Sequence, residues 1–379
     1  MNTPTNSKAL TKHIRQALEA AGGALSFARF MEMALYHPKW GYYQHHSIEI
    51  GKQGDFTTAP EISPLFTQCL ARQCAALFKQ LPNAILELGA GTGRLAGDLL
   101  LALHNQGIAI EHYYIVEISA ALRKKQKAFL TTHCPQLVKH VTWLDQLPID
   151  FAGVILANEV LDALPVHCFR IEETVKERCV AWQDNQFVWQ TKIPSAELNK
   201  EATRLRDTLR LTDGYESEIN LSLHTFIPDL AHCLKQGVIL LIDYGYGERE
   251  YYHPERRQGT LTCFYQHRRY DDPLLFPGAQ DMTTHVDFTR VIEIASAHDC
   301  TLLGYTSQAA FLLACGLMEL AAAEEERLSP ADQVHLHHTI KILTFPTEMG
   351  ELVKVMALGK NVAPDTLLGF TLQDRRRDL

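Results

Sequence analysis

Short apolar runs separated by segments of helical spacing dominate the middle of the chain. The runs occupy residues 84–89, 113–118, 141–144, 153–159 and 237–245. Each has the length of a β-strand, and a nearly continuous apolar sequence of that length is typical of strands buried on both faces of a parallel sheet. Because strands that alternate with helices build such sheets, the pattern predicts an α/β fold with a doubly wound, Rossmann-like sheet.

Further patterns surround these five runs. Two later apolar runs, at 301–307 and 351–359, extend the predicted sheet to seven strands. Apolar residues at helical spacing predict a helix over 8–36, before Pro38. The same spacing predicts three later helices, over 286–298, 308–323 and 330–343.

An insertion separates the fourth and fifth runs. Its stretches 166–171 and 187–193 alternate apolar and polar residues, as antiparallel hairpins do. We therefore divide the chain into three parts: an N-terminal helical region with a cofactor or substrate loop (1–75), a sheet core (76–165 and 236–365) and an inserted lobe on the substrate side (166–235).

Composition narrows the class of protein without choosing a function. The 379 residues are 46% apolar and 21% charged, as in ordinary globular proteins. A formal net charge of −8 gives no overall attraction to phosphate backbones, so we expect no nucleic-acid partner. The absence of a secretory signal or a membrane-length apolar stretch predicts no membrane insertion and favours the cytoplasm. A weakly basic start with Lys8, Lys12 and Arg15 leaves organelle import open.

The metal-ligating residue types show no metal-site spacing. The nine cysteines are scattered singly, without a CxxC pair. A site built from His285 with Asp281 or Asp287 has no supporting ligand pattern. We therefore predict no metal cofactor.

A glycine turn after the first run is the sharpest local signal. Glu87 is followed by Gly89, Gly91 and Gly93 in the sequence LELGAGTG, just before a predicted helix. A dinucleotide fingerprint needs its third glycine one residue later, so the turn fits S-adenosylmethionine better than NAD. An acid before the glycines can accept hydrogen bonds from the ammonium group of the cofactor's amino acid.

Further candidate cofactor-binding residues close the next three runs. Glu117 ends the second run, where its two carboxylate oxygens can accept both ribose hydroxyls. Trp143 and Leu144 close the third run and are a candidate adenine-binding edge. Asn158 closes the fourth run at the same edge of the sheet. A lone glycine turn is often only tight packing, but this combination in strand order favours a cofactor site.

A long loop rich in Gly, Pro and aromatic residues precedes the first run. A loop this long and specific is typical of a lid over a binding site, with a rigid structural plug as the alternative. Its candidate cofactor or substrate contacts are Asp55, Thr57, Thr58, Pro60 and Glu61.

Several blocks together resemble the MidA-like methyltransferases. They are GDFTTAPEIS at 54–63, LELGAGTG at 86–93, ANEVLDALPV at 157–166, LIDYGY at 241–246 and the long block at 256–288. The family includes a mitochondrial complex I assembly factor that methylates protein arginine. The resemblance implies a class I methyltransferase fold, S-adenosyl-L-methionine as cofactor and a polypeptide substrate, with a complex I subunit as one candidate. It places the cofactor on Glu87, the three glycines and Glu117, with Asn158 and Glu159 at the boundary with the substrate.

Carboxylates at the ends of the fourth and fifth runs are the candidate catalytic groups. A guanidinium nucleophile needs carboxylates that hold its charge or take up the released proton. Glu159, Asp162 and Asp243 suit this task, and Tyr244 is expected beside the substrate. His285 is a further candidate. Asp162 as a helix cap and His285 as a structural histidine are the competing interpretations.

Two other functions stay open at this stage. The chain could act as a cofactor-binding assembly chaperone, or it could methylate a small molecule. The inserted lobe and the helices near 308–343 are candidate partner or homodimer surfaces.

Overall fold

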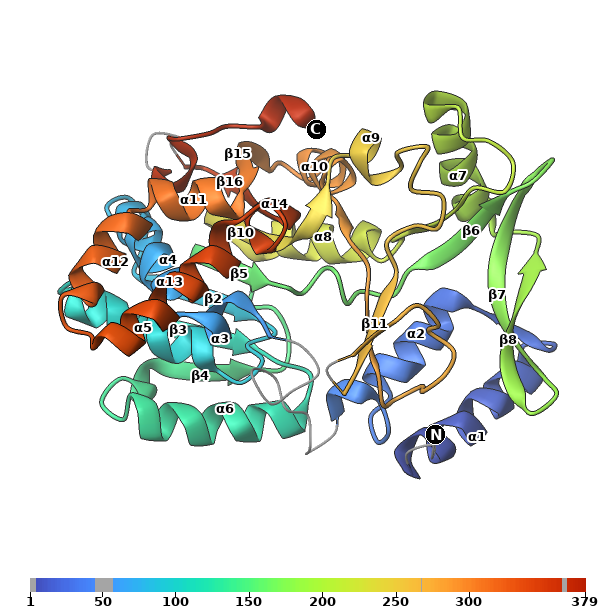
Figure 1. Cartoon of the computed structure of the whole chain (residues 1–379), viewed down its shortest axis with the longest axis horizontal. Helices are drawn as coiled ribbons and strands as arrows, with labels where there is room; N and C mark the ends of the chain where they lie inside the picture. The colour runs from blue at the N-terminus through green and yellow to red at the C-terminus, as the bar shows by residue number, and fades with distance from the viewer. Residues whose placement is uncertain (1–4, 45–56, 267, 363–366) are drawn as a thin grey trace.

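The computed structural model describes residues 5–44, 57–266, 268–362 and 367–379, and two sheets dominate it (Figure 1). The larger sheet contains the seven predicted strands in the order β15-β16-β10-β5-β2-β3-β4, and the short β14 pairs with β10 off this path. These strands are β2 (Ala84–Leu88), β3 (His112–Val116), β4 (Val141–Leu144), β5 (Phe151–Asn158), β10 (Leu234–Tyr246), β14 (Val286–Asp287), β15 (Thr301–Ser307) and β16 (Val353–Lys360). The first five are parallel, whereas β16 runs antiparallel to β10 and β15.

Helices cover both faces of this sheet, so the predicted doubly wound α/β fold is confirmed. Successive strand residues point to opposite faces, and Ile85 and Leu86 accordingly belong to different apolar clusters. The Ile85 cluster includes residues of α4 (Pro64–Leu77), α5 (Arg94–Asn105), α6 (Ala120–His133), α11 (Gln308–Ala314), α12 (Leu317–Glu325) and α13 (Pro330–Thr344). The Leu86 cluster includes residues of α8 (Leu223–Cys233) and α10 (Phe288–Ser296).

The second sheet joins the N-terminal region to the insertion. Its strands are β1 (Ala24–Ser26), β6 (His167–Ile171), β7 (Val175–Gln183), β8 (Gln186–Lys192) and β9 (Glu216–Ile219). All of its pairings are antiparallel, and β1 pairs with β7 although about 150 residues separate them. The flanking helices are α1 (Thr5–Ala20), α2 (Phe27–Tyr36) and α7 (Ala196–Leu209).

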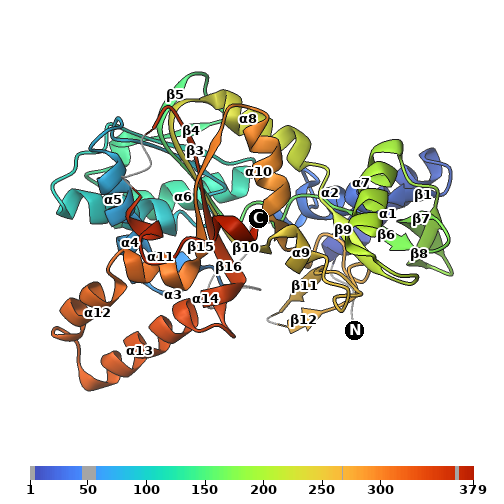
Figure 2. The same cartoon turned by 90° about the horizontal axis from the view of Figure 1, so that it is seen from above.

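A third, smaller sheet lies between these two, as the view from above shows (Figure 2). This three-stranded sheet consists of β11 (Thr262–Tyr265), β12 (Arg268–Tyr270) and β13 (Asp281–Thr283). The remaining helical turns are η1 (Tyr42–Gln44), α3 (Ala59–Ile62), η2 (Val138–His140), α9 (Glu248–Tyr251), α14 (Met349–Leu352), η4 (Leu368–Phe370) and η5 (Arg376–Asp378). Across the described ranges, no helix combines the length and apolarity needed to cross a membrane.

Two helices differ from their predicted extents because glycines interrupt them. The predicted helix over 8–36 is two helices, since Gly22 and Gly23 have φ of 75° and 97° and the chain then enters β1. The predicted helix over 308–323 breaks between α11 and α12 at Gly316, where φ is 84°. These left-handed conformations suit glycine and end a helix.

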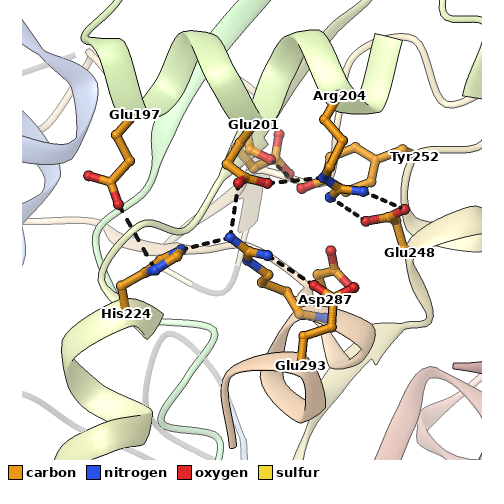
Figure 3. A network of polar contacts seen from close by, with 10 residues as sticks. Glu197, Glu201, Arg204, His224, Glu248, Tyr252, Asp287 and Glu293 are labelled. Atoms are coloured by element: carbon orange, nitrogen blue, oxygen red, sulfur yellow. Dashed lines mark hydrogen bonds and ion pairs between the residues drawn. The ribbon is translucent and has the colours of Figure 1, made fainter. Parts of the chain in front are cut away.

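Charged side chains connect the lobe helix α7 to helices α8, α9 and α10 (Figure 3). Arg204 on α7 donates to both oxygens of Glu248 on α9, at 3.1 and 2.6 Å. An Nη of Arg290 on α10 lies 3.1 Å from Glu201 of α7 and 3.0 Å from the ring of His224 on α8. The inserted lobe is thereby fixed to the sheet core next to β14.

We expect the Arg290–Glu201 pair to stabilise this junction. The two side chains are only 21% and 10% exposed, so solvent screens them less than a surface pair. A double-mutant cycle with Arg290→Met and Glu201→Gln should give a coupling free energy on the order of 1 kcal/mol in urea unfolding. Additive single effects would show that the pair contributes nothing.

Candidate functional site

A cavity of about 1060 Å³ opens at the carboxyl ends of β2, β3 and β5. Its other walls come from α2, α3 and the strands β11 and β13 of the small sheet. Ligands of doubly wound sheets bind at this edge, next to the point where the strand order reverses between β2 and β5. The volume is at the upper limit of the roughly 300–1,000 Å³ typical of small-ligand sites, so a second group can lie beside a bound cofactor.

Most of the predicted site residues line this cavity. They are Thr57, Thr58, Pro60, Glu61, Glu87, Gly89, Gly91, Glu117, Asn158, Glu159, Asp162, Tyr244 and His285. Four others are not part of its lining, namely Gly93, Trp143, Leu144 and Asp243. Asp55 lies outside the described residues.

The glycine turn after β2 brings backbone atoms to the cavity surface. Gly89, Gly91 and Gly93 have φ of 60°, 51° and 88°, in the left-handed region that side chains rarely adopt. A Cβ on Gly93 would lie 3.3 Å from the Cα of Gln126, so α6 packs directly against the turn. The turn therefore requires glycine for its conformation and for this close approach.

Glu87 is buried at the end of β2, with an exposure of 2%. The hydroxyl of Tyr113 donates to its carboxylate at 2.6 Å. Burial raises the pKa of Glu87 to about 7, with a smaller contribution from Glu117, and the Tyr113 hydrogen bond opposes the rise. The carboxyl group therefore ionises less readily than an exposed glutamate.

Glu117 follows β3 and has a hydrogen-bond donor on each oxygen. The backbone N–H of Ser119 donates to Oε1 at 2.9 Å, and Nε2 of Gln126 donates to Oε2 at 3.0 Å. Burial raises the pKa of Glu117, and these donors oppose the rise. Gln126 was not among the predicted residues, although its spacing of four from Leu122 and Leu130 puts it on the buried face of α6.

Trp143 and Leu144 lie behind the wall that contains Glu117. The indole N–H of Trp143 donates to Oε1 of Gln126 at 2.9 Å. The carbonyl of Leu144 accepts a hydrogen bond from Arg123 at 2.6 Å. Both residues thus contact side chains of α6, next to the cavity wall that contains Glu117. Their direct contact with an adenine ring stays a prediction.

Asp243 holds the turn that follows β5. Its Oδ2 accepts the backbone N–H groups of Val160, Leu161 and Asp162 at 3.1, 2.8 and 3.3 Å. Its Oδ1 accepts the N–H of Tyr244 at 2.8 Å. Asp243 is 0% exposed, so its carboxylate is engaged by the backbone and does not face the cavity.

Acidic side chains gather where this turn meets the cavity. Burial and the nearby Asp243 raise the pKa of Glu159 to about 8. Burial and three neighbouring carboxylates hold the pKa of Asp162 well above its usual range, and its Oδ1 has no hydrogen-bond partner among the described residues. Asp281 of β13 is 1% exposed and completes the group.

Two tyrosines from the N-terminal region face these acids and were not predicted from the sequence. The hydroxyl of Tyr43 donates to Asp281 at 2.9 Å, and that of Tyr36 donates to the carbonyl of Ala163 at 2.8 Å. Their rings stack with centroids 5.5 Å apart. The carbonyl of Tyr43 also accepts a hydrogen bond from Ser119, beside Glu117, at 2.6 Å. The spacing of aromatic residues in 36–43 was the available signal.

The predicted loop residues contact both sides of the site. Glu61 on α3 accepts a hydrogen bond from Thr92 of the glycine turn. The backbone N–H of Ala59 donates to Glu159 at 3.3 Å. Helix α3 therefore lies between the turn after β2 and the turn after β5.

His285 also lines the cavity. Burial, followed by the nearby Arg256, lowers its pKa to about 4, so the imidazole is neutral at physiological pH. Its backbone N–H donates to Thr260 at 2.9 Å, and Thr260 in turn donates to the buried Glu218. The part of the chain that the structure describes contains no group of three His, Cys, Asp or Glu side chains suited to a metal ion.

The fold and its cavity are those of an S-adenosyl-L-methionine-dependent methyltransferase, with a glycine turn and an acidic residue after successive strands. The chain belongs to a family of such methyltransferases, whose model matches residues 69–306. The resemblance to MidA-like proteins is thereby confirmed, and S-adenosyl-L-methionine is the cofactor.

Solved structures and curated proteins agree with this assignment. A Burkholderia thailandensis protein crystallised with S-adenosyl-homocysteine is 38% identical, with a TM-score of 0.92 over 99% of this chain and 97% of that one. The Drosophila melanogaster "Protein arginine methyltransferase NDUFAF7 homolog, mitochondrial" is 28% identical over 92% of this chain and 84% of its own length. The Homo sapiens "Protein arginine methyltransferase NDUFAF7, mitochondrial" is 26% identical over 92% of this chain and 83% of its own length.

Replacing Asp243 should unfold the turn after β5 rather than only slow the reaction. In Asp243→Asn the side-chain amide cannot accept four backbone N–H groups, so we expect a loss of unfolding free energy on the order of 3 kcal/mol in urea titrations. Asp162→Asn is the matched control, since its Oδ1 lacks a partner, and should cost less than about 1 kcal/mol. Equal losses would contradict the structural role of Asp243.

The ionisation of Glu159 should lower the stability of the ligand-free protein as pH rises. Its folded-state pKa of about 8 lies above the value of roughly 4.3 expected in the unfolded chain, so the folded state holds the proton more tightly. The stability that protonated Glu159 contributes is therefore fully present below about pH 4, and it is lost as pH rises through about 8. In urea unfolding, Glu159→Gln should gain stability relative to the wild type across this window. A difference that does not change with pH would contradict the raised pKa.

Proposed function

We propose that this methyltransferase modifies the guanidinium group of an arginine in a polypeptide. The observation that carries the proposal is the acidic group at the cavity wall. Glu159 and Asp162 line the cavity, and neither is ion-paired with a Lys or Arg side chain in the described ranges. Asp162 is buried and Glu159 is half-buried, and carboxylates removed from solvent are costly without a cation. A guanidinium supplies that cation with planar, paired donors.

The cavity wall fits the cofactor in two respects. The glycine turn exposes backbone beside Glu87, which suits the amino-acid end of S-adenosyl-L-methionine. Glu117 lines the cavity and keeps a lone-pair position beyond its protein donors, which suits a ribose hydroxyl. In this proposal Gly89, Gly91 and Asn158 complete the contact.

S-adenosyl-L-methionine supplies the methyl group as an electrophile on a sulfonium. The protein's residues orient the nucleophile and manage its charge. Glu159 and Asp162 hold the guanidinium, and one of them accepts the proton that leaves the attacking nitrogen. The raised pKa of Glu159, about 8, makes this group an effective proton acceptor near neutral pH, and burial with neighbouring carboxylates raises the pKa of Asp162 in the same direction. Asp281 and the rings of Tyr36, Tyr43 and Tyr244 provide the rest of a pocket for a cation.

The names of the relatives, which call them protein arginine methyltransferases, support a polypeptide substrate. A respiratory complex I subunit is the first target to test, as the family resemblance implies. A homodimer and a cytoplasmic location stay predictions.

Methyl transfer should depend on Glu159 while cofactor binding should not. We expect mass spectrometry to detect methylated arginine after incubation of the protein with S-adenosyl-L-methionine and purified complex I subunits. Glu159→Gln should lower kcat/KM by about 100-fold or more, the usual effect of losing a general base, with S-adenosyl-homocysteine affinity nearly unchanged. For the wild type, kcat/KM should rise with pH up to about 8, because the carboxyl group must ionise to hold the cation.

Glu117→Ala is the complementary control. It should abolish S-adenosyl-homocysteine binding in calorimetry. Methylation of a small molecule with no arginine product would overturn the substrate class. Rescue of complex I assembly in cells by a Glu117→Ala variant that cannot bind cofactor would favour the chaperone alternative.

A further inference from the structure

Gln126 occupies the junction between the two halves of the cofactor wall. It comes from the middle of α6, and its side chain is completely buried. Its Nε2 donates to the carbonyl of Gly91 at 3.0 Å and to Oε2 of Glu117 at 3.0 Å. One amide group thus connects the glycine turn after β2 with the acid after β3.

Trp143 determines how this amide is oriented. An indole N–H can only donate a hydrogen bond, so the atom that faces it must be the amide oxygen. Both N–H groups of Gln126 are then directed at Gly91 and Glu117. Every polar atom of the amide is used, which leaves no alternative orientation with the same number of hydrogen bonds.

This arrangement also sets which part of Glu117 is free. The backbone N–H of Ser119 occupies one position on Oε1, and Gln126 occupies one on Oε2. The backbone of Ile118 contributes a further hydrogen bond to this carboxylate. A carboxylate offers about four acceptor positions, so one remains for the cavity side, where Glu117 lines the wall.

We propose that Gln126 is a positioning residue for the cofactor, which fixes the distance between the glycine turn and Glu117, and that Trp143 locks its amide in the required orientation. The inference rests on the proposed roles of Gly91 and Glu117 in binding the cofactor. Trp143 acts through Gln126 and needs no contact with the cofactor. A neutral amide suits this position because it donates a hydrogen bond to Glu117 and adds no charge of its own to the site.

Calorimetric titration of the full chain with S-adenosyl-homocysteine tests the inference. Gln126→Leu should weaken binding about 10- to 100-fold, because it removes the bond to a charged acceptor and leaves buried polar atoms unpaired. Trp143→Phe keeps the ring but loses the donor, and should weaken binding by about 3- to 10-fold. Lys127→Met is the matched control. Its ammonium lies 5.1 Å from the centroid of the Trp143 ring, and its loss should change affinity less than about threefold.

Gln126→Glu supplies a readout that a general packing defect would not change. Two carboxyl groups at this distance must share a proton, so the loss of affinity relative to wild type should grow as pH rises from 6 to 9. Glu87, Glu117, Arg123 and Lys127 are the charged groups nearby, and titrating the wild type at each pH accounts for them.

The outcomes separate this inference from the proposed cofactor site. Unchanged affinity in Gln126→Leu and Trp143→Phe, or a loss in Gln126→Glu that does not vary with pH, would overturn the positioning role. If Gln126→Leu fails to fold, Trp143→Phe and Gln126→Glu decide the question in the same way. Failure of the wild type to bind, or full binding by Glu117→Ala, would instead overturn the proposed cofactor site.

Discussion

The cost of burying carboxylates organises this molecule. Parallel strands end at one edge of the sheet, and five acids from four strands or the turns after them gather there: Glu87, Glu117, Glu159, Asp162 and Asp243. An acid with many hydrogen-bond donors holds neighbouring backbone in place, as Asp243 does by accepting four backbone N–H groups. Glu159 and Asp162 have fewer partners and face the cavity. The difference in hydrogen bonding separates Asp243, which holds a turn in place, from the two acids to which the proposed function assigns the substrate cation.

The N-terminal region and the small three-stranded sheet cover this edge. The N-terminal region contributes Tyr36 and Tyr43, and the small sheet contributes Asp281, so the cavity lies between the sheet core and the lobe. Tyr43 contacts both halves of the site, through its carbonyl to Ser119 and its hydroxyl to Asp281. The charged network around Arg290 and Glu201 holds helix α7 of the lobe against helix α10 of the sheet core.

The sheet and the cofactor edge could be predicted because their signals are local. A run such as 153–159 is apolar at every buried position, and the glycine turn lies within five residues. Gln126 and Tyr43 could not be assigned in this way. Local spacing indicates that they are buried or aromatic positions, but their hydrogen-bond partners lie in other elements, so their roles appear only in the folded structure. Asp243 shows the same limit, because the sequence places it at the right edge of the sheet but cannot show that its carboxylate turns toward the backbone.

The walls of the cavity come from stretches that are far apart in the chain, so the ribosome makes them at different times. The glycine turn emerges early, whereas His285 lies three quarters of the way along the 379 residues. Strand β16, which pairs with β10 and β15, comes later still. A growing chain therefore exposes apolar strands and acids before their partners are made, and unpaired strand edges of this kind promote aggregation during folding.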